Sequence, residues 1–295
     1  MGHSVTPQPN PPTTVARRLR SLVGSVPLVD VPTAAIVVLM IAGTPLLVWG
    51  THRGHVPWWA AFLAGTYLMN LSFTAWHEPA HGTFSSSRRL NLIVGWLSSF
   101  ASVYPGYFAR RREHLVHHKF EGTQGKDPVY PRIQTTFFGF PLRIMQQMFK
   151  PDPLDVPETF HPITPGQRLS DMISNLLVLG VLGVAIALGF WRALLVAWIV
   201  PRFFVVMIHA YYICFFPHHI EDGGYRVYRI RRDGILLKLL TVNQHMHGIH
   251  HKWPWIPWHK YQLVRRELGD ELYNEDIEEV GRPFEATTSG GTQSR

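Results

Sequence analysis

Histidines gather at three places along this chain of 295 residues. The three stretches read HEPAH, HLVHH and HGIHH, with histidines spaced i, i+4 in the first and i, i+3, i+4 in the other two. Residues at these spacings share one face of a helix, so each set can aim two or three imidazoles in one direction. The eight residues are His77, His81, His114, His117, His118, His247, His250 and His251.

Imidazole nitrogens are good ligands for iron, zinc, copper and nickel. A single four-coordinate zinc takes at most four protein ligands, so eight histidines predict two metal ions with open coordination positions. His218, His219 and His245 are candidates for a further ligand, and His218 is preferred. Pro79 lies inside the first set and is expected to kink the helix there, or to place the set just beyond its end.

Long apolar segments must position these histidines. Charged residues make up only 16% of the chain and hydrophobic residues 46%, whereas about a quarter of the residues in a soluble protein are charged. A bilayer core of about 30 Å needs roughly 20 apolar residues in a helix. Residues 33–50, 57–76, 172–190 and 194–216 meet this requirement. We therefore predict an all-α integral membrane protein with four transmembrane helices in two hairpins.

The basic residues predict how the helices are oriented. The two short hairpin turns carry one basic residue each, Arg53 and Arg192, whereas the loop 77–170 and the tail from 217 onward carry 11 each. By the positive-inside rule, both termini and all three histidine sets lie in the cytoplasm. The same rule accounts for the pI near 9.8, so no nucleic-acid partner is expected.

Residues 90–109 are also nearly free of charge and long enough to cross a membrane. If this segment crossed once, the first and second histidine sets would face opposite compartments. We therefore predict a re-entrant or interfacial pair of short helices, bent near Pro105 and Gly106. Irregular backbone at membrane depth is tolerated where protein surrounds it.

The remaining organisation is simple. Residues 1–30 are expected to form a cytoplasmic, partly disordered segment without a secretory signal, 31–285 a single membrane domain, and 286–295 a disordered tail. The single cysteine, Cys214, excludes an intramolecular disulfide and a cysteine-ligated iron–sulfur cluster.

The order of the three sets over two hairpins resembles the membrane fatty acid desaturase and hydroxylase superfamily, over about residues 70–260. The resemblance implies a cytoplasmic di-iron cap on an enzyme of the endoplasmic reticulum or, as expected here, the bacterial inner membrane. It also implies that O2 and two electrons are used to attack an unactivated C–H bond of a lipid. The implied iron ligands are the eight histidines above, with His218 as a ninth.

The residues around the second and third sets narrow the resemblance. HHKFEGTQGKDPVYP and HGIHHKWPWIPWHKY are similar to cyanobacterial-type beta-carotene hydroxylases. Carotenoid hydroxylation is therefore the first candidate function and fatty acyl desaturation the alternative; a carotenoid ketolase and a histidine-rich metal transporter are more remote. Glu78 and Pro79 in the first set depart from the hydroxylase pattern.

Aromatic and acidic residues beside the histidines have two interpretations each. Trp253, Trp255 and Trp258 are either an interfacial belt or the entrance for a lipid substrate. Glu78, Glu113 and Asp127 either accept hydrogen bonds from ligand N–H groups or are solvated loop charges.

Electrons are expected from a separate ferredoxin or cytochrome-type carrier, because no stretch of this sequence has the pattern of a redox domain. The basic residues that could steer such a carrier are Arg110, Arg111, Arg112, Lys119 and Lys126. Membrane topology is the other explanation for this basic group. Arg202, within an apolar segment, is expected to face the helix bundle or to snorkel to an interface.

Overall fold

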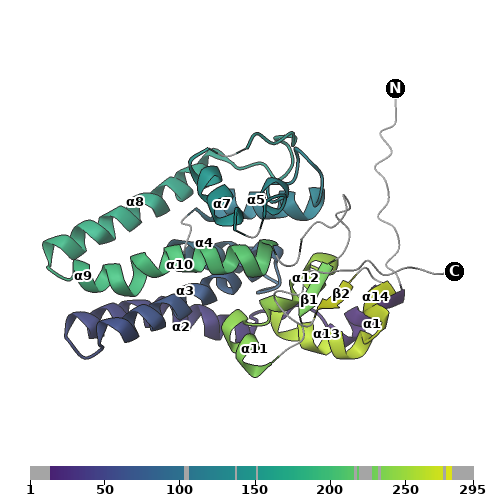
Figure 1. The fold of residues 1–295 in the computed structure, drawn as a ribbon, viewed down its shortest axis with the longest axis horizontal. Coiled ribbons are helices and arrows are strands. Elements are labelled where there is room, and N and C mark those ends of the chain that lie inside the picture. The colour runs from purple at the N-terminus through teal and green to yellow at the C-terminus, as the bar shows by residue number, and fades with distance from the viewer. Residues whose placement is uncertain are drawn as a thin grey trace.

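A computed structural model of the chain describes residues 14–102, 106–136, 138–150, 152–215, 218, 228–231, 234–274 and 277–280. The predicted disordered tail and residues 1–13 of the N-terminal segment lie outside these residues. The described chain is predominantly helical. Four long helices lie side by side as two hairpins, with both hairpin turns at the same end (Figure 1). They are α2 (Val31–His52), α3 (Trp58–His81), α8 (Pro165–Ala187) and a continuous helix over Trp191–Phe215.

Three of these helices are long and apolar enough to cross a membrane: α2, α8 and Trp191–Phe215. Helix α3 is as long, with 24 residues, but it does not belong to this group. Its C-terminal half carries the polar side chains of the first histidine set, including His77 and Glu78, and they are buried inside the protein. The four predicted helices are therefore present as two hairpins. The second helix, α3, is less apolar than the sequence analysis expected.

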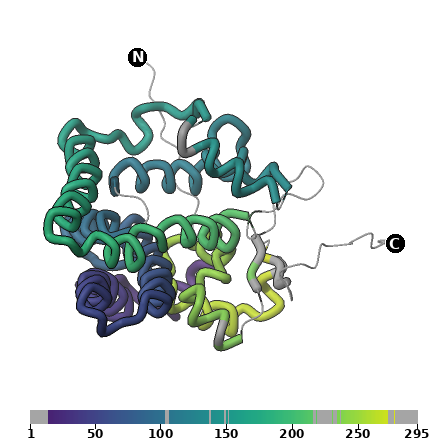
Figure 2. The backbone as a smooth tube through the Cα atoms, turned by 60° about the vertical axis from the view of Figure 1, so that its left-hand side comes forward, coloured from purple at the N-terminus to yellow at the C-terminus, as the bar shows by residue number. Residues whose placement is uncertain are grey.

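Most of the shorter elements lie toward the end opposite the hairpin turns, as Figures 1 and 2 both show, whereas Arg88–Ala101 runs beside α3. Before α8 come α1 (Thr14–Val23), α4 (Arg88–Ala101), α5 (Tyr107–Phe120), α6 (Tyr130–Ile133) and α7 (Phe140–Phe149). After the long helices come β1 (Tyr228–Arg231), α11 (Ile235–Thr241), α12 (His247–Lys252), α13 (Tyr261–Leu268), α14 (Glu271–Asn274) and β2 (Ile277–Val280). The parallel pair β1–β2 is an addition to the predicted all-α fold.

The two hairpins are in close contact at Gly65, where no side chain separates their backbones. A Cβ at Gly65 of α3 would collide with the carbonyl oxygen of Ala197. Ala197 lies in a π-helical turn, η1 (Leu195–Ile199), between α9 (Trp191–Leu194) and α10 (Val200–His209). A second π-helical turn, η2 (Ala210–Phe215), ends the helix. Small residues at helix contacts allow such close backbone approach in membrane proteins.

Arg202 faces the interior of the bundle. Its Nη2 donates to the carbonyl oxygen of Phe100 at 3.3 Å, and its guanidinium lies 3.9 Å from the ring centre of Trp198. The Trp198 indole N–H donates to the carbonyl oxygen of Ala101 at 3.0 Å. The two side chains thus satisfy carbonyls at the C-terminal end of α4, where a cation is also favoured by the helix dipole.

The segment 90–109 folds as two helices rather than one. Helix α4 has 14 residues and is about 21 Å long, too short to cross a 30 Å hydrocarbon core. Gly106 precedes α5 with a φ of 108°, a backbone conformation that favours glycine. Pro105 lies outside the described residues, so the predicted bend is observed on the Gly106 side.

Helix α5, which carries the second histidine set, is capped from another helix. Asp171 of α8 accepts from the backbone N–H groups of Phe108 at 3.0 Å and Ala109 at 2.8 Å. Gly106 has no side chain to do this itself. The N-terminal N–H groups of a helix need such acceptors, so Asp171 fixes α5 to the second hairpin.

Replacing Asp171 by Ala should lower the free energy of unfolding by about 1–2 kcal/mol, because two N–H groups lose their acceptor. Thermal unfolding in detergent is the measurement, and Tm should fall by a few degrees. The control is Asp155→Ala, which changes an exposed loop carboxylate. Equal Tm values for the two variants would contradict this role of Asp171.

Candidate metal centre

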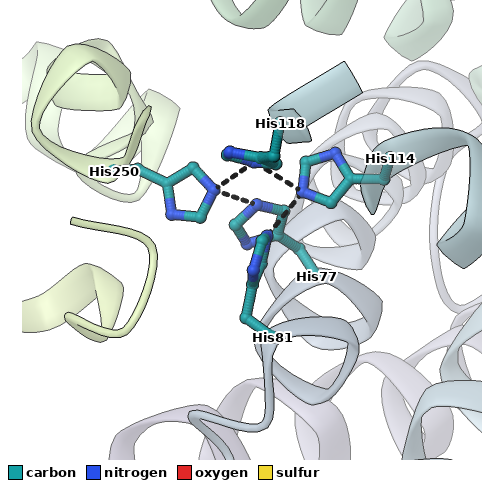
Figure 3. A group of neighbouring side chains, drawn as sticks. All are labelled: His77, His81, His114, His118 and His250. Atoms are coloured by element: carbon teal, nitrogen blue, oxygen red, sulfur yellow. Dashed lines mark hydrogen bonds between the residues drawn. The ribbon is translucent and has the colours of Figure 1, made fainter. Parts of the chain in front are cut away.

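Five histidines from three helices point their Nε2 atoms at one another (Figure 3). Successive Nε2 atoms are 2.6–3.2 Å apart. Two nitrogens bound at right angles to one metal, each at about 2.1 Å, are about 3 Å apart. We call this group cluster A; it consists of His77 and His81 of α3, His114 and His118 of α5, and His250 of α12.

The neighbours of the imidazoles determine which ring nitrogens can face inward in cluster A. A neutral imidazole has a single N–H. His77 Nδ1 lies 3.2 Å from Oε1 of Glu78, and an ionised Glu78 accepts the proton of that nitrogen. In this arrangement His77 Nε2 presents a lone pair toward His250 Nε2 at 3.1 Å. Inward-pointing lone pairs are the donor set that a transition metal requires.

A second group lies beside the first. We call it cluster B; it consists of His117, Glu121, His218 and His251. Glu121 Oε1 is 3.1 Å from His218 Nδ1 and 3.0 Å from His251 Nδ1. His117 Nδ1 is 2.7 Å from Asp127 Oδ1, which leaves Nε2 of His117 to face the cluster.

Neighbouring histidines in the chain belong to different clusters. His117 joins cluster B and His118 cluster A, while His250 joins cluster A and His251 cluster B. Consecutive residues on a helix point about 100° apart, so an HH pair serves two sites. The expectation that each set aims at one point therefore holds for HEPAH and not for the two HxxHH sets.

His247 lies between the two clusters. Its ring centre is 4.9 Å from that of His250 and 4.7 Å from that of His251. Its Nδ1 is 3.2 Å from Gln244 Oε1. All nine histidines predicted as ligands are thus in, or adjoin, one of two neighbouring clusters.

The other two candidates for the further ligand differ from His218. His245 is buried, with Nδ1 2.7 Å from the hydroxyl of Thr241, and it belongs to neither cluster. His219 lies outside the described residues. Pro79 does not break the first set, because α3 continues to His81 and ends at Gly82, which has a φ of 74°.

Burial keeps most of these imidazoles neutral. Desolvation lowers the pKa of His114, His118, His250 and His251 well below the usual value of a histidine. His117 differs: burial disfavours its charge, but the charge of Asp127 and the hydrogen bond to it outweigh burial and raise its pKa. Neutral imidazole is the form that binds metal.

Acidic residues surround the clusters. Glu78 is fully buried and accepts from the Thr83 hydroxyl at 2.6 Å. Asp127 accepts from the backbone N–H groups of Gly122 and Val129 at 2.9 and 2.8 Å. Glu78 and Asp127 are thus placed to orient His77 and His117.

The sequence analysis did not identify Glu121. It follows His117 by four residues, immediately after α5 ends, and this i, i+4 spacing was the available signal. Glu113, the third acid considered, does not contact a cluster in this way: it forms an ion pair with Arg132 at 2.8 Å.

The three tryptophans do not line the cavity described below. Trp253 is buried in a core with Leu19 of α1, Trp255 lies under the guanidinium of Arg20 at 4.7 Å, and the Trp258 indole donates to Thr33 at 3.1 Å. These residues attach the C-terminal elements to α1 and to the start of α2, and the interpretation as a substrate entrance stays a prediction.

A cavity of about 600 Å³ reaches residues of both clusters. Its lining includes His114, His117 and His247. Apolar side chains from α3 and from the last long helix form much of the wall, including Phe73, Trp76, Val206 and Ile213. The volume is typical of a site for a small molecule or for part of a lipid.

Comparisons with known proteins agree with this arrangement. The sequence profile of one family, described as fatty acid desaturase, matches residues 53–281. The zeaxanthin 4-ketolase of Chlamydomonas reinhardtii is 27% identical over 267 residues, 81% of this chain. A sphingolipid delta(4)-desaturase DES1-like protein of Arabidopsis thaliana is 26% identical over 87% of this chain and 76% of its own length.

A chloroplastic omega-3 fatty acid desaturase of Glycine max is 27% identical over 242 residues, 70% of this chain. The matched region spans about half the length of the ketolase and of the omega-3 desaturase, 54% and 52%.

The protein should bind two equivalents of Fe(II) under anaerobic conditions. His81→Ala should remove one equivalent, because it opens cluster A, and His218→Ala should remove the other, because it opens cluster B. Iron analysis after gel filtration measures this. The control His55→Ala changes an exposed histidine in a hairpin turn and should leave both equivalents in place. One equivalent in the wild type would contradict two sites.

Proposed function

The chain belongs to the fatty acid desaturase family and is an oxidoreductase, and on this premise we propose that it is a membrane enzyme that uses O2 and two electrons to oxidise a C–H bond of a lipid. The main observation in support of this proposal is the pair of adjoining histidine clusters at one end of four long helices, beside a largely apolar cavity. Hydroxylation would follow RH + O2 + 2e− + 2H+ → ROH + H2O. Desaturation would remove two hydrogens from the substrate and release two waters.

Two iron ions would occupy the clusters and supply the activation of O2. Cluster A would hold one through its five imidazoles, and cluster B the other. His247 adjoins both clusters, so a small ring movement brings it to either. Glu121 adds an oxygen beside His218 and His251. Borderline nitrogen and hard oxygen donors together suit iron.

The residues around the ligands would hold them in place. Glu78 and Asp127 each take the Nδ1–H of a histidine, so that Nε2 of His77 and of His117 turns inward. Arg111 Nε donates to the carbonyl oxygen of Ala80 at 3.1 Å. This bond ties α5 to the last turn of α3 and keeps the first two histidine sets together.

The four long helices would cross a bacterial inner membrane. Both hairpin turns lie at one end, and the histidines lie toward the other (Figure 1). Basic residues are concentrated at the histidine end, so that end and both termini would be cytoplasmic. Residues 31–285 would form one domain, with α3 crossing in contact with its neighbours because its polar residues are covered by protein.

A carotenoid is the first candidate substrate, because one relative is a carotenoid ketolase and the segments after the second and third sets resemble carotenoid hydroxylases. Acyl desaturation is the second candidate, supported by the sphingolipid and omega-3 desaturases. Both reactions begin with attack on a C–H bond held near the metals. The position of that bond decides the product.

A separate carrier, of the ferredoxin or cytochrome type, would supply the electrons. Arg110 stacks on Trp76 at 3.8 Å and Arg111 binds Ala80, so these two have roles inside the protein. Lys119 is exposed on α5, between the histidines and solvent. It is the better candidate for contact with an acidic carrier.

In a bacterial host that makes carotenoids and contains a ferredoxin system, the wild-type chain should add oxygen to carotenoid, as read by mass spectrometry of whole lipids. His118→Ala should reduce product formation more than about 100-fold and should lower bound iron. Loss of a residue that only hydrogen-bonds to a metal ligand costs at most about that factor. His55→Ala is the control. Acyl chains that lose two hydrogens, with carotenoid unchanged, would favour the desaturase candidate; full activity of His118→Ala would refute both.

Lys119→Glu should slow ferredoxin-dependent turnover by about tenfold at low salt, because steering by opposite charge raises association rates by that order or more. The deficit should shrink in about 0.5 M salt, where charges are screened within a few ångströms. Arg53→Glu, in a hairpin turn at the opposite end, is the matched control. A deficit equal at both salt concentrations would argue against docking at Lys119.

A further inference from the structure

The lining of the cavity has two unlike parts. One part consists of His114, His117 and His247 together with aromatic and aliphatic side chains. The other part consists of Glu113, Arg132, Gln147 and Asp152, from α5, α6, α7 and the loop after α7. A cavity for a plain hydrocarbon has no need of the second part, since buried polar groups cost free energy unless they are hydrogen-bonded.

These four residues form one continuous polar network. Arg132 Nη2 donates to Glu113 Oε1 at 2.8 Å, and Arg132 Nε donates to Gln147 Oε1. Gln147 Nε2 in turn donates to Asp152, which also accepts from Arg143 at 2.8 Å. The Gln147 side chain is buried, whereas Glu113 and Asp152 are 46% and 30% exposed. We call this network the polar mouth.

The charges of the polar mouth are balanced. Two guanidinium groups pair with two carboxylates: Arg132 with Glu113, and Arg143 with Asp152. An anionic headgroup would have to displace a carboxylate from Arg132 and would meet the other acid. An uncharged hydroxyl can donate to a carboxylate oxygen and accept from an N–H at once, so it joins the network without breaking an ion pair.

The polar mouth is also near the histidines. Glu113 precedes His114 directly and His117 by four residues on α5, and one turn of a helix rises about 5.4 Å. With the reach of two side chains, the distance from a hydroxyl bound there to the histidine clusters would be on the order of 10 Å. An extended chain covers about 1.2 Å per bond, so this corresponds to roughly eight bonds.

We propose that the substrate is an amphiphile whose uncharged, hydroxyl-bearing end sits in the polar mouth, and that oxidation falls on a carbon within about eight bonds of that hydroxyl. This inference rests on the proposed function and deepens it. It selects a ring-hydroxylated carotenoid over beta-carotene. Among acyl lipids it selects a ceramide, oxidised near its hydroxyls, over a fatty acid anion oxidised toward its methyl end.

Pairs of substrates test the proposal on the full chain in lipid nanodiscs, with iron, O2 and a ferredoxin system. The pairs are zeaxanthin with beta-carotene, and ceramide with a fatty acid of equal chain length. In whichever class is oxidised, the hydroxylated member should have a kcat/KM roughly tenfold higher, since a hydrogen bond to a charged group is worth about that factor. Fragmentation mass spectrometry should place the oxidised carbon within about eight bonds of the hydroxyl.

A variant in the polar mouth separates binding from chemistry. Gln147→Leu should raise KM for the hydroxylated substrate roughly tenfold and leave its kcat, and the kinetics of the other member of the pair, nearly unchanged. The matched control is Gln146→Leu, the same change on the exposed face of α7. Bound iron, measured in both variants, reports whether the fold and the clusters are intact.

The outcomes distinguish the two proposals. Equal use of both members of a pair, or oxidation far from the hydroxyl, overturns the polar mouth as a substrate site and leaves the oxidase in place. Two bound irons without oxidation of any substrate overturn the proposed function instead. If Gln147→Leu loses iron, the substrate pairs and the position of oxidation in the wild type still decide.

Discussion

Imidazole lone pairs that face one another at about 3 Å repel unless a proton or a metal lies between them, and the rest of this structure depends on holding them there. In cluster A the five Nε2 atoms stand in such contact, in rings that are buried or half-buried. Burial lowers the pKa of His114 and His250, so a second proton on these rings is disfavoured. A bound cation would relieve the repulsion, and it would join α3, α5 and α12, which are far apart in the sequence.

The scaffold is built from polar contacts in places where water cannot substitute for them. Asp171 caps α5 from the second hairpin, and Arg202 reaches the carbonyl end of α4. Asn70 of α3 donates to the carbonyl oxygen of Leu240 in α11 at 2.5 Å and meets His209 of α10 at 3.2 Å. Each bond joins one of the long helices to another element, and the contact between Asn70 and His209 joins the two hairpins. Apolar packing alone gives little orientation to helices in a lipid environment, because lipid chains are as apolar as leucine.

The hairpins and the histidine sets followed from local patterns in the sequence. Charge-free runs predicted the long helices, and the spacing of His114, His117 and His118 predicted a shared site. The division of each HxxHH set between two clusters could not be predicted in this way, because it depends on where α3 and α12 lie relative to α5. Glu121 and the polar mouth depend on the path of the segment 121–160, in which the sequence analysis predicted no helices, although α6 and α7 lie there. The contacts of the tryptophans after His251 could not be predicted, because an aromatic run predicts burial but not the partner, here α1 and the start of α2.

The two clusters are chemically unequal, and this inequality follows from their neighbours. Cluster A is all imidazole, with Glu78 as the carboxylate bound to one of its histidines. Cluster B contains Glu121 and borders Asp127, so two carboxylates lie close to it. Two divalent cations in adjoining sites repel, and the repulsion is large where the effective dielectric constant is low. Negative charge placed on one side lowers the repulsion and makes that side the better place for positive charge. The cavity meets both sides, through His114 of cluster A and His117 of cluster B, so a substrate carbon near these two residues would lie between a cluster without a carboxylate and a cluster that contains one.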